Sequence, residues 1–146
     1  MSLSTPPFAV CEFTTLHSSF EEDLAAYSAA GVSGIGICEI KLKEGGEEEQ
    51  LEALKASGLE SRSAVPAVPS ILPLPLFPGP EDPDERVEAL CASVRRLAPF
   101  EPSALVCLTG PAGELGDADA RRIVVEGLRA VADEAECAGF RWGSSR

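Results

Sequence analysis

Apolar and polar positions fall into alternating blocks along this chain, and each block predicts one element of an α/β fold. Four short segments rich in apolar and β-branched residues have the character of strands: residues 8–14, 32–40, 61–68 and 103–108. Amphipathic stretches follow them, with apolar residues three and four positions apart, and predict helices over residues 18–30, 47–57, 82–97 and 117–138. The order of the blocks indicates four βα units.

Local signals support the helix ends. Ser18 and Glu21 have the spacing of a capping box, Asp82 followed by Pro83 is typical of a helix start, and Asp117 or Asp119 would cap the last helix. Three of the helices end in a small residue and a glycine, at Ala30-Gly31, Ser57-Gly58 and Ala138-Gly139. After Phe140 only a short tail remains, so we expect one partial domain over residues 1–146 whose C-terminal half is missing.

The strand at residues 103–108 is wholly apolar, which is typical of a strand buried on both faces of a parallel sheet. We therefore expect a parallel sheet in the order 1-2-3-4 with right-handed crossovers. A flavodoxin-like doubly wound sheet is the main alternative, although no phosphate loop of that kind follows the first strand.

Charge narrows the choice of partners. The 146 residues include 24 acidic and 12 basic side chains, for a formal net charge of −12. Such a surface repels phosphate backbones and anionic headgroups, so we expect neither a nucleic-acid nor a membrane partner. The start of the chain has no basic segment followed by a long apolar one, so it does not resemble a secretory signal.

The five cysteines are far apart, odd in number and free of any C-x-x-C spacing. This pattern predicts a reducing cytoplasmic location with neither a disulfide framework nor a zinc site.

Several short motifs resemble one family. They are Thr14-Thr15 after the first strand, the helix end Ala29-Ala30-Gly31-Val32, the strand Gly34-Ile35-Gly36-Ile37 and the helix end at residues 134–139. Together they resemble the xylose isomerase-like TIM-barrel superfamily of sugar isomerases and epimerases, to which endonuclease IV-like enzymes also belong. The resemblance covers only the first four of eight βα units. It implies half of a (β/α)8 TIM barrel.

Members of this superfamily generally hold a divalent metal, Mn or Mg, with Glu, Asp, His and Glu side chains at the ends of strands five to eight. Strand five would start at about Phe140, so the resemblance places no metal ligand and no cofactor in this chain. It implies instead that the chain supplies substrate contacts from its own strand ends. The acidic surface and the missing ligands disfavour an endonuclease.

The candidate substrate-binding residues are those at the carboxyl ends of the strands. They are Glu12, Thr15, His17, Glu39, Lys41 and Thr109. His17 could donate to a substrate hydroxyl or simply precede a helix cap. Glu39 and Lys41 would share a strand face by period two, where they could polarise a carbonyl or form an ordinary ion pair. Thr109 precedes Gly110 in a loop that could admit a phosphate or be an ordinary connection.

The loop over residues 69–80 is rich in proline and leucine. It could be an apolar lid, a surface for a partner chain, or an extended proline-rich ligand.

These features predict a sugar isomerase- or epimerase-like protein, incomplete and inactive by itself, with a small sugar as its ligand. The alternative is a non-catalytic half-barrel interaction module or a homo-oligomer that associates through open strand edges or the inner sheet face.

Overall fold

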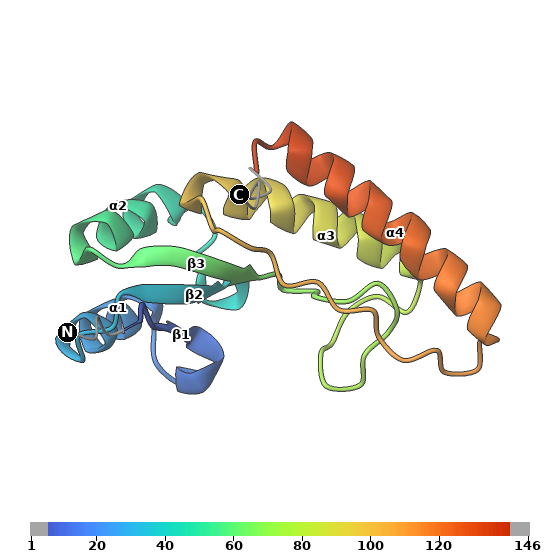
Figure 1. Ribbon diagram of the computed structural model, residues 1–146, viewed down its shortest axis with the longest axis horizontal. Coiled ribbons are helices and arrows are strands. Elements are labelled where there is room, and N and C mark those ends of the chain that lie inside the picture. The colour runs from blue at the N-terminus through green and yellow to red at the C-terminus, as the bar shows by residue number, and fades with distance from the viewer. Residues whose placement is uncertain (1–5, 141–146) are drawn as a thin grey trace.

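The computed structural model describes residues 6–140 and places a small parallel sheet beside a pair of long helices (Figure 1). Three strands form the sheet in the order β1-β2-β3: β1 is Ala9–Cys11, β2 is Gly34–Cys38 and β3 is Glu60–Val65. Both pairings are parallel, with Val10 opposite Ile35 and Ile37 opposite Ala64.

Helices α1 (Phe20–Ala29) and α2 (Glu47–Ser57) connect the strands. Their apolar residues, among them Leu24, Tyr27 and Leu54, join Ile35 and Ile37 of β2 in the main core. Ile35 and Ile37 alternate with Gly34 and Gly36, so one face of β2 is apolar and the other has only the Cys38 side chain.

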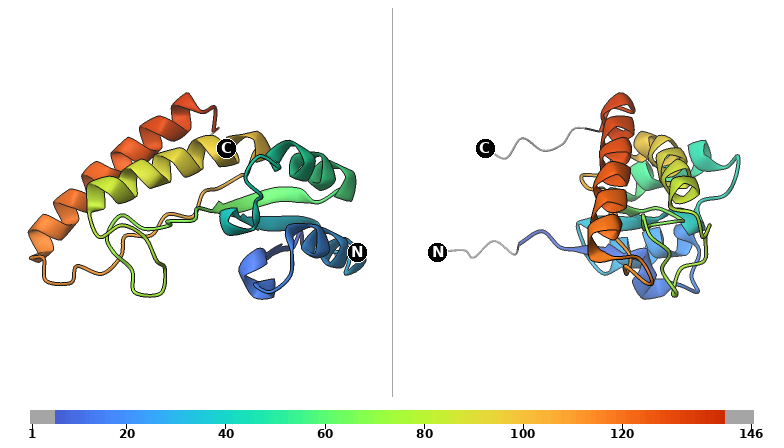
Figure 2. Two further views of the ribbon diagram at one scale, coloured as in Figure 1. Left: turned by 180° about the vertical axis from the view of Figure 1, so that it is seen from behind. Right: turned by 90° about the vertical axis from the view of Figure 1, so that its right-hand side faces the viewer.

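Helices α3 (Pro83–Leu97) and α4 (Asp117–Cys137) lie side by side and extend beyond the sheet (Figures 1 and 2). A second core cluster, with Ile71, Leu90, Val94 and Val131, holds them against the loop that follows β3. Gly127 makes this approach close, since a Cβ there would lie 2.9 Å from Ile71 Cγ2 and 3.0 Å from Val87 Cγ2.

Short 3-10 turns follow two of the strands and the third helix. They are η1 (Glu12–Thr15) after β1, η2 (Glu39–Lys41) after β2 and η3 (Ala98–Phe100) after α3. The Phe20 and Phe100 rings meet edge to face at 6.4 Å, which ties α1 to η3.

The prediction of four βα units forming half of a TIM barrel is wrong. The described residues form a three-stranded sheet with four α-helices, not four βα units, and the structure shows no half TIM barrel. Residues 103–108 do run beside β3 and its continuation, but they make only isolated bridges, at Ala64 with Leu105 and at Ser70 with Leu108.

Proline explains why this fourth pairing breaks. The Val106 N–H donates to the Ala64 carbonyl at 2.9 Å, and the Leu108 N–H donates to the Pro69 carbonyl at 2.7 Å. Pro66 lies between those two bonds and Pro69 accepts the second. Neither proline has an N–H to donate, so a continuous ladder cannot form.

Smaller corrections concern the element ends. The strands are shorter than predicted, because the chain turns into η1 and η2 directly after Cys11 and Cys38. The capping box of α1 is formed by Ser19 and Glu22, one residue later than predicted, and α4 is capped by the backbone of Gly116 rather than by an aspartate side chain. The predicted start of α3, with Asp82 as its cap and Pro83 in its first turn, is confirmed.

Candidate functional site

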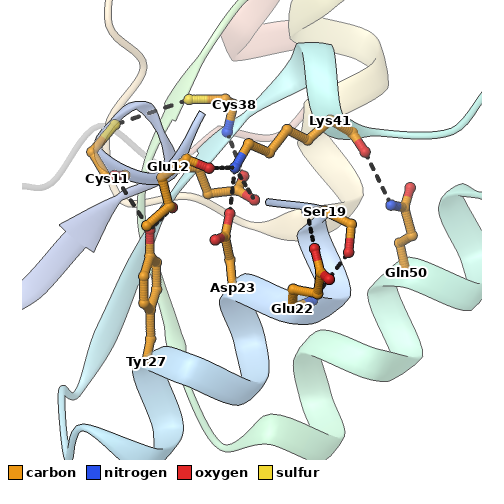
Figure 3. Close-up of polar contacts among 10 residues, drawn as sticks. Cys11, Glu12, Ser19, Glu22, Asp23, Tyr27, Cys38, Lys41 and Gln50 are labelled. Carbon is orange, nitrogen blue, oxygen red and sulfur yellow. Dashed lines mark hydrogen bonds and ion pairs between the residues drawn. The ribbon is translucent and has the colours of Figure 1, made fainter. Parts of the chain in front are cut away.

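Three ionisable side chains meet in the interior at the carboxyl ends of β1 and β2 (Figure 3). Glu12 opens η1, Lys41 ends η2 and Asp23 lies in the first turn of α1. The relative exposures of their side chains are 0% for Glu12, 1% for Asp23 and 6% for Lys41. We call these three residues the Glu12–Lys41 cluster.

Lysine 41 is the centre of this cluster. Its Nζ donates to Asp23 Oδ2 at 2.5 Å and to the Thr15 carbonyl at 2.7 Å, and it lies 4.0 Å from Glu12 Oε1. The Lys41 ammonium group therefore contacts two carboxyl groups and one backbone carbonyl. Such an arrangement joins η1, η2 and α1 through a single side chain.

The carboxyl group of Glu12 is held on one side only. Its Oε2 accepts the Cys38 backbone N–H at 2.8 Å, whereas its Oε1 has no hydrogen-bond partner among the described residues. Burial raises the pKa of Glu12 to about 8, against the opposing effect of the Cys38 hydrogen bond. Glu12 thus holds a proton at neutral pH and can still lose it.

A second layer of polar groups supports the cluster from α1. Tyr27 Oη lies 2.5 Å from Thr15 Oγ1 and 3.5 Å from the Cys11 carbonyl, and burial raises the pKa of its phenol. Asp23 and Tyr27 are four residues apart on the helix face that also carries Phe20 and Leu24. Sequence reasoning missed Asp23, although an aspartate within an apolar helical stripe was a signal that could have pointed to it.

The structure separates Glu39 from Lys41, contrary to the prediction that they share a strand face. Both residues lie in η2 rather than in β2, so period-two alternation does not apply. Glu39 Oε2 accepts the Ala67 N–H at 2.7 Å, and its Oε1 lies 3.5 Å from Arg96 Nη1. Glu39 therefore fastens the end of β3 to α3, away from Lys41.

The remaining candidates lie on or near the surface. His17 is exposed in the turn between η1 and α1, and Thr15 is half-buried beside Lys41. Thr109 is exposed, and its carbonyl accepts the Leu72 N–H at 2.9 Å. The adjacent Gly110 has φ +80° and packs so closely on Leu72 that a Cβ would lie 2.5 Å from its carbonyl oxygen. The Thr109–Gly110 turn therefore holds the proline-rich loop in place through Leu72. It does not lie at the start of α4.

Among residues 6–140, no group of three or more His, Cys, Asp or Glu side chains is arranged to hold a metal ion. None of the helices described is long and apolar enough to cross a membrane.

The fold and the cluster together define an α/β protein whose buried ionisable groups gather at the carboxyl edge of a parallel sheet. No protein-family model and no curated protein matches the sequence. The fold is similar to that of protein SMc04130 from Sinorhizobium meliloti 1021, known from its crystal structure, with a TM-score of 0.71 and 23% sequence identity. The similarity covers 92% of this chain and 48% of that protein, so this chain spans about half the length of that protein. The likeness concerns the fold alone.

Proposed function

We propose that this chain is a small-molecule-binding unit of the sugar isomerase and epimerase type, which contacts a sugar with η1 and η2 and does not complete a reaction by itself. The observation that carries this proposal is the enclosed carboxyl of Glu12, whose pKa of about 8 lies close to neutral pH, beside the Lys41 ammonium at the carboxyl edge of the sheet. Parallel α/β sheets place their ligands at that edge.

The chemistry of isomerisation explains why such a pair suits a sugar. A proton next to a carbonyl must be removed, held and returned, and a group whose pKa is close to the ambient pH does this best. A nearby cation stabilises the negative charge that develops on the carbonyl oxygen. Glu12 and Lys41 have the chemical character for these two roles.

Solvent exposure decides which residues a sugar would reach first. Glu12 is fully enclosed, whereas Thr14 and His17 on the same segment are exposed. Sugar hydroxyls would therefore meet the η1 turn first, and Glu12 would be reached only when η1 moves away from η2. Completion of a metal-assisted reaction would need ligands besides the described residues, which is why we expect binding without turnover.

The test is a titration of the ¹⁵N-labelled chain with a ketose and with its reduced polyol, followed by amide chemical shifts. We expect shifts concentrated in residues 12–17 and 39–41, with weaker binding to Glu12→Gln and unchanged binding to Glu44→Gln, which alters an exposed carboxylate. Shifts elsewhere, or none at millimolar sugar, would refute the proposal. Net isomerisation by the chain alone, measured by NMR with Mn²⁺ or Mg²⁺ added, would refute the proposal that the chain does not complete a reaction by itself.

A second candidate function is association with another copy, favoured by the open edge of β1. Within the described residues, β1 pairs only with β2, so its other side presents unpaired backbone groups. Phe8, directly before β1, and Leu16, directly after η1, are exposed large apolar residues that flank this strand. Light scattering should show a dimer that Leu16→Glu weakens, and a monomer at 100 µM would exclude this function.

The five cysteines are all free thiols, which favours a reducing compartment such as the cytoplasm.

A further inference from the structure

A cleft of about 700 Å³ lies between the loop after β3 and the loop before α4. These two segments run near one another beneath the α3–α4 pair (Figures 1 and 2). Most of the lining is apolar and comes from Leu72, Leu74, Phe77, Leu115 and several prolines. We call it the proline cleft. It is separate from the Glu12–Lys41 cluster, none of whose residues lines it.

Arg86 lines this cleft from the second turn of α3 and is only 1% exposed. Its Nε donates to the Ser70 carbonyl at 2.9 Å, its Nη1 to the Pro80 carbonyl at 2.7 Å and its Nη2 to Ser70 Oγ at 2.8 Å. A guanidinium has five N–H donors, so these three bonds do not use all of them.

No carboxylate of residues 6–140 lies within 4.0 Å of the Arg86 guanidinium, although arginines 62, 95, 96 and 122 each have such a partner. A buried arginine without a carboxylate is uncommon, because an uncompensated charge is costly in a poorly solvated interior. Arginine stays protonated in proteins, so the positive charge persists even though burial lowers the pKa of Arg86.

The acidic residues of the cleft offset this charge only in part: Glu81 attracts the guanidinium, but burial still lowers the pKa of Arg86. Glu81 and Glu114 line the cleft, but both are exposed, so water and salt screen them. The charge of Arg86 acts through the protein interior, where screening is weaker. The chain as a whole has a net charge of −12 and repels anions. The proline cleft differs, because a buried positive charge lines it.

We propose that the proline cleft binds a small organic anion with an apolar body, whose phosphate or carboxylate group is directed toward Arg86. The apolar walls match the body of such a ligand, and the guanidinium matches its charged end. This inference goes beyond the proposed sugar site and does not depend on it.

The walls of the cleft are held in place before any ligand arrives. Ser70 Oγ donates to the Leu72 carbonyl at 2.7 Å while it accepts from Arg86, and the Leu72 N–H donates to Thr109. Gly79 lies so close to Arg86 that a Cβ there would be 2.9 Å from Nη1. A preformed site loses less entropy on binding than one that must be ordered.

The test is a titration of the ¹⁵N-labelled chain with phenyl phosphate, with benzyl alcohol as the neutral analogue and inorganic phosphate as the anion without an apolar body. We expect phenyl phosphate to shift the amides of residues 72–79 and 112–115 and to bind at least about tenfold more tightly than either comparison compound. Equal binding of benzyl alcohol would overturn the role of Arg86, and equal binding of inorganic phosphate would overturn that of the apolar walls. Absence of shifts in the cleft would overturn the site itself.

Arg86→Met removes the charge but also three hydrogen bonds, so it could release the loop. The rim carboxylates give a sharper variant, because removing their negative charge should strengthen anion binding without touching Arg86. We expect Glu81→Gln and Glu114→Gln each to tighten phenyl phosphate binding by about two- to fivefold. Glu88→Gln, an exposed change on α3 outside the cleft, should leave it unchanged.

Unchanged or weaker binding in both rim variants would contradict the proposal. Glu12→Gln should bind phenyl phosphate like the parent chain, so failure of the sugar site and failure of this cleft are separable outcomes.

Discussion

The carboxyl group of Glu12, the first residue after β1, accepts a 2.8 Å hydrogen bond from the backbone N–H of Cys38, the last residue of β2. This bond closes the gap between two neighbouring strand ends and fixes the carboxyl beside Lys41. Its other oxygen is left without a partner in a buried position. The buried position of Glu12 therefore favours the neutral form of its carboxyl group.

The first prediction concerns the pH dependence of stability. Glu12 has a folded-state pKa of about 8, well above its ordinary value of 4.5, so between these limits the folded chain binds a proton that the unfolded chain has released. Its stabilising contribution is complete below pH 4.5 and is lost as the pH rises toward 8. At roughly 1.4 kcal/mol per pH unit, the loss is on the order of 4 kcal/mol.

Urea unfolding at pH 5, 6, 7 and 8 measures this loss. Glu12→Gln should flatten the pH dependence, whereas Glu44→Gln should keep it. A parent chain equally stable from pH 5 to 8 would show that Glu12 ionises normally.

The second prediction concerns the lysine of the cluster. Lys41→Met removes the ammonium 2.5 Å from the buried Asp23 carboxylate and should cost about 3–5 kcal/mol of unfolding free energy. The double variant Asp23→Asn with Lys41→Met should recover part of this loss, because no uncompensated charge remains.

The matched control is Lys43→Met, whose ammonium forms an ion pair with Glu21 at the surface. That change should cost less than about 1 kcal/mol. Similar losses of unfolding free energy in Lys41→Met and Lys43→Met would mean that the buried position of Lys41 adds nothing to stability.

Most helix positions could be predicted from the sequence, because the signals for helix ends come from neighbouring residues. Glycine after a small residue ends α2 at Gly58 in the left-handed conformation, and Asp82 with Pro83 begins α3, so those boundaries depend only on neighbouring residues. Parallel strands also placed Glu12 and Lys41 at the same edge of the sheet, but the sequence pattern paired Lys41 with Glu39 and not with Glu12.

Other features depended on contacts distant in sequence. Residues 103–108 do not form a fourth strand, because prolines 66 and 69 interrupt the segment with which they would pair. The apolar pattern of residues 103–108 gives no indication of this interruption. Asp23 and Arg86 are buried because of groups they meet on other elements. The apolar stripe around Asp23 indicates burial, but neither sequence position identifies the partner groups.

The third prediction concerns the glycine face of β2. A Cβ at Gly36 would lie 2.8 Å from Ser63 Oγ and 3.1 Å from the Cys11 Cα, so the Ser63 side chain must move and the β1 backbone must give way slightly. Gly36→Ala should therefore destabilise the chain by about 1–3 kcal/mol in urea unfolding. Gly116→Ala is the control, since nothing lies within 4 Å of a Cβ there, and an equal loss in both would contradict the crowding.

The fourth prediction concerns the aromatic contact between Phe13 of η1 and Phe77 of the loop after β3. The rings meet edge to face at 5.6 Å, a geometry worth about 0.5–1.5 kcal/mol. Phe77→Ala should speed amide hydrogen exchange at the non-proline residues of 73–79. Leu76→Ala should not, because Leu76 is 86% exposed. Equal exchange in the parent chain and Phe77→Ala would show that the ring contact does not hold the loop.

The fifth prediction is the titration of Glu12 itself, observed through the ¹³C shift of its side-chain carboxyl in a glutamate-labelled chain and assigned with Glu12→Gln. A midpoint near pH 8 is expected, and it would place a proton-holding carboxyl beside Lys41 at neutral pH. A midpoint near 4.5 would contradict the proposed role of this site in handling a sugar's proton.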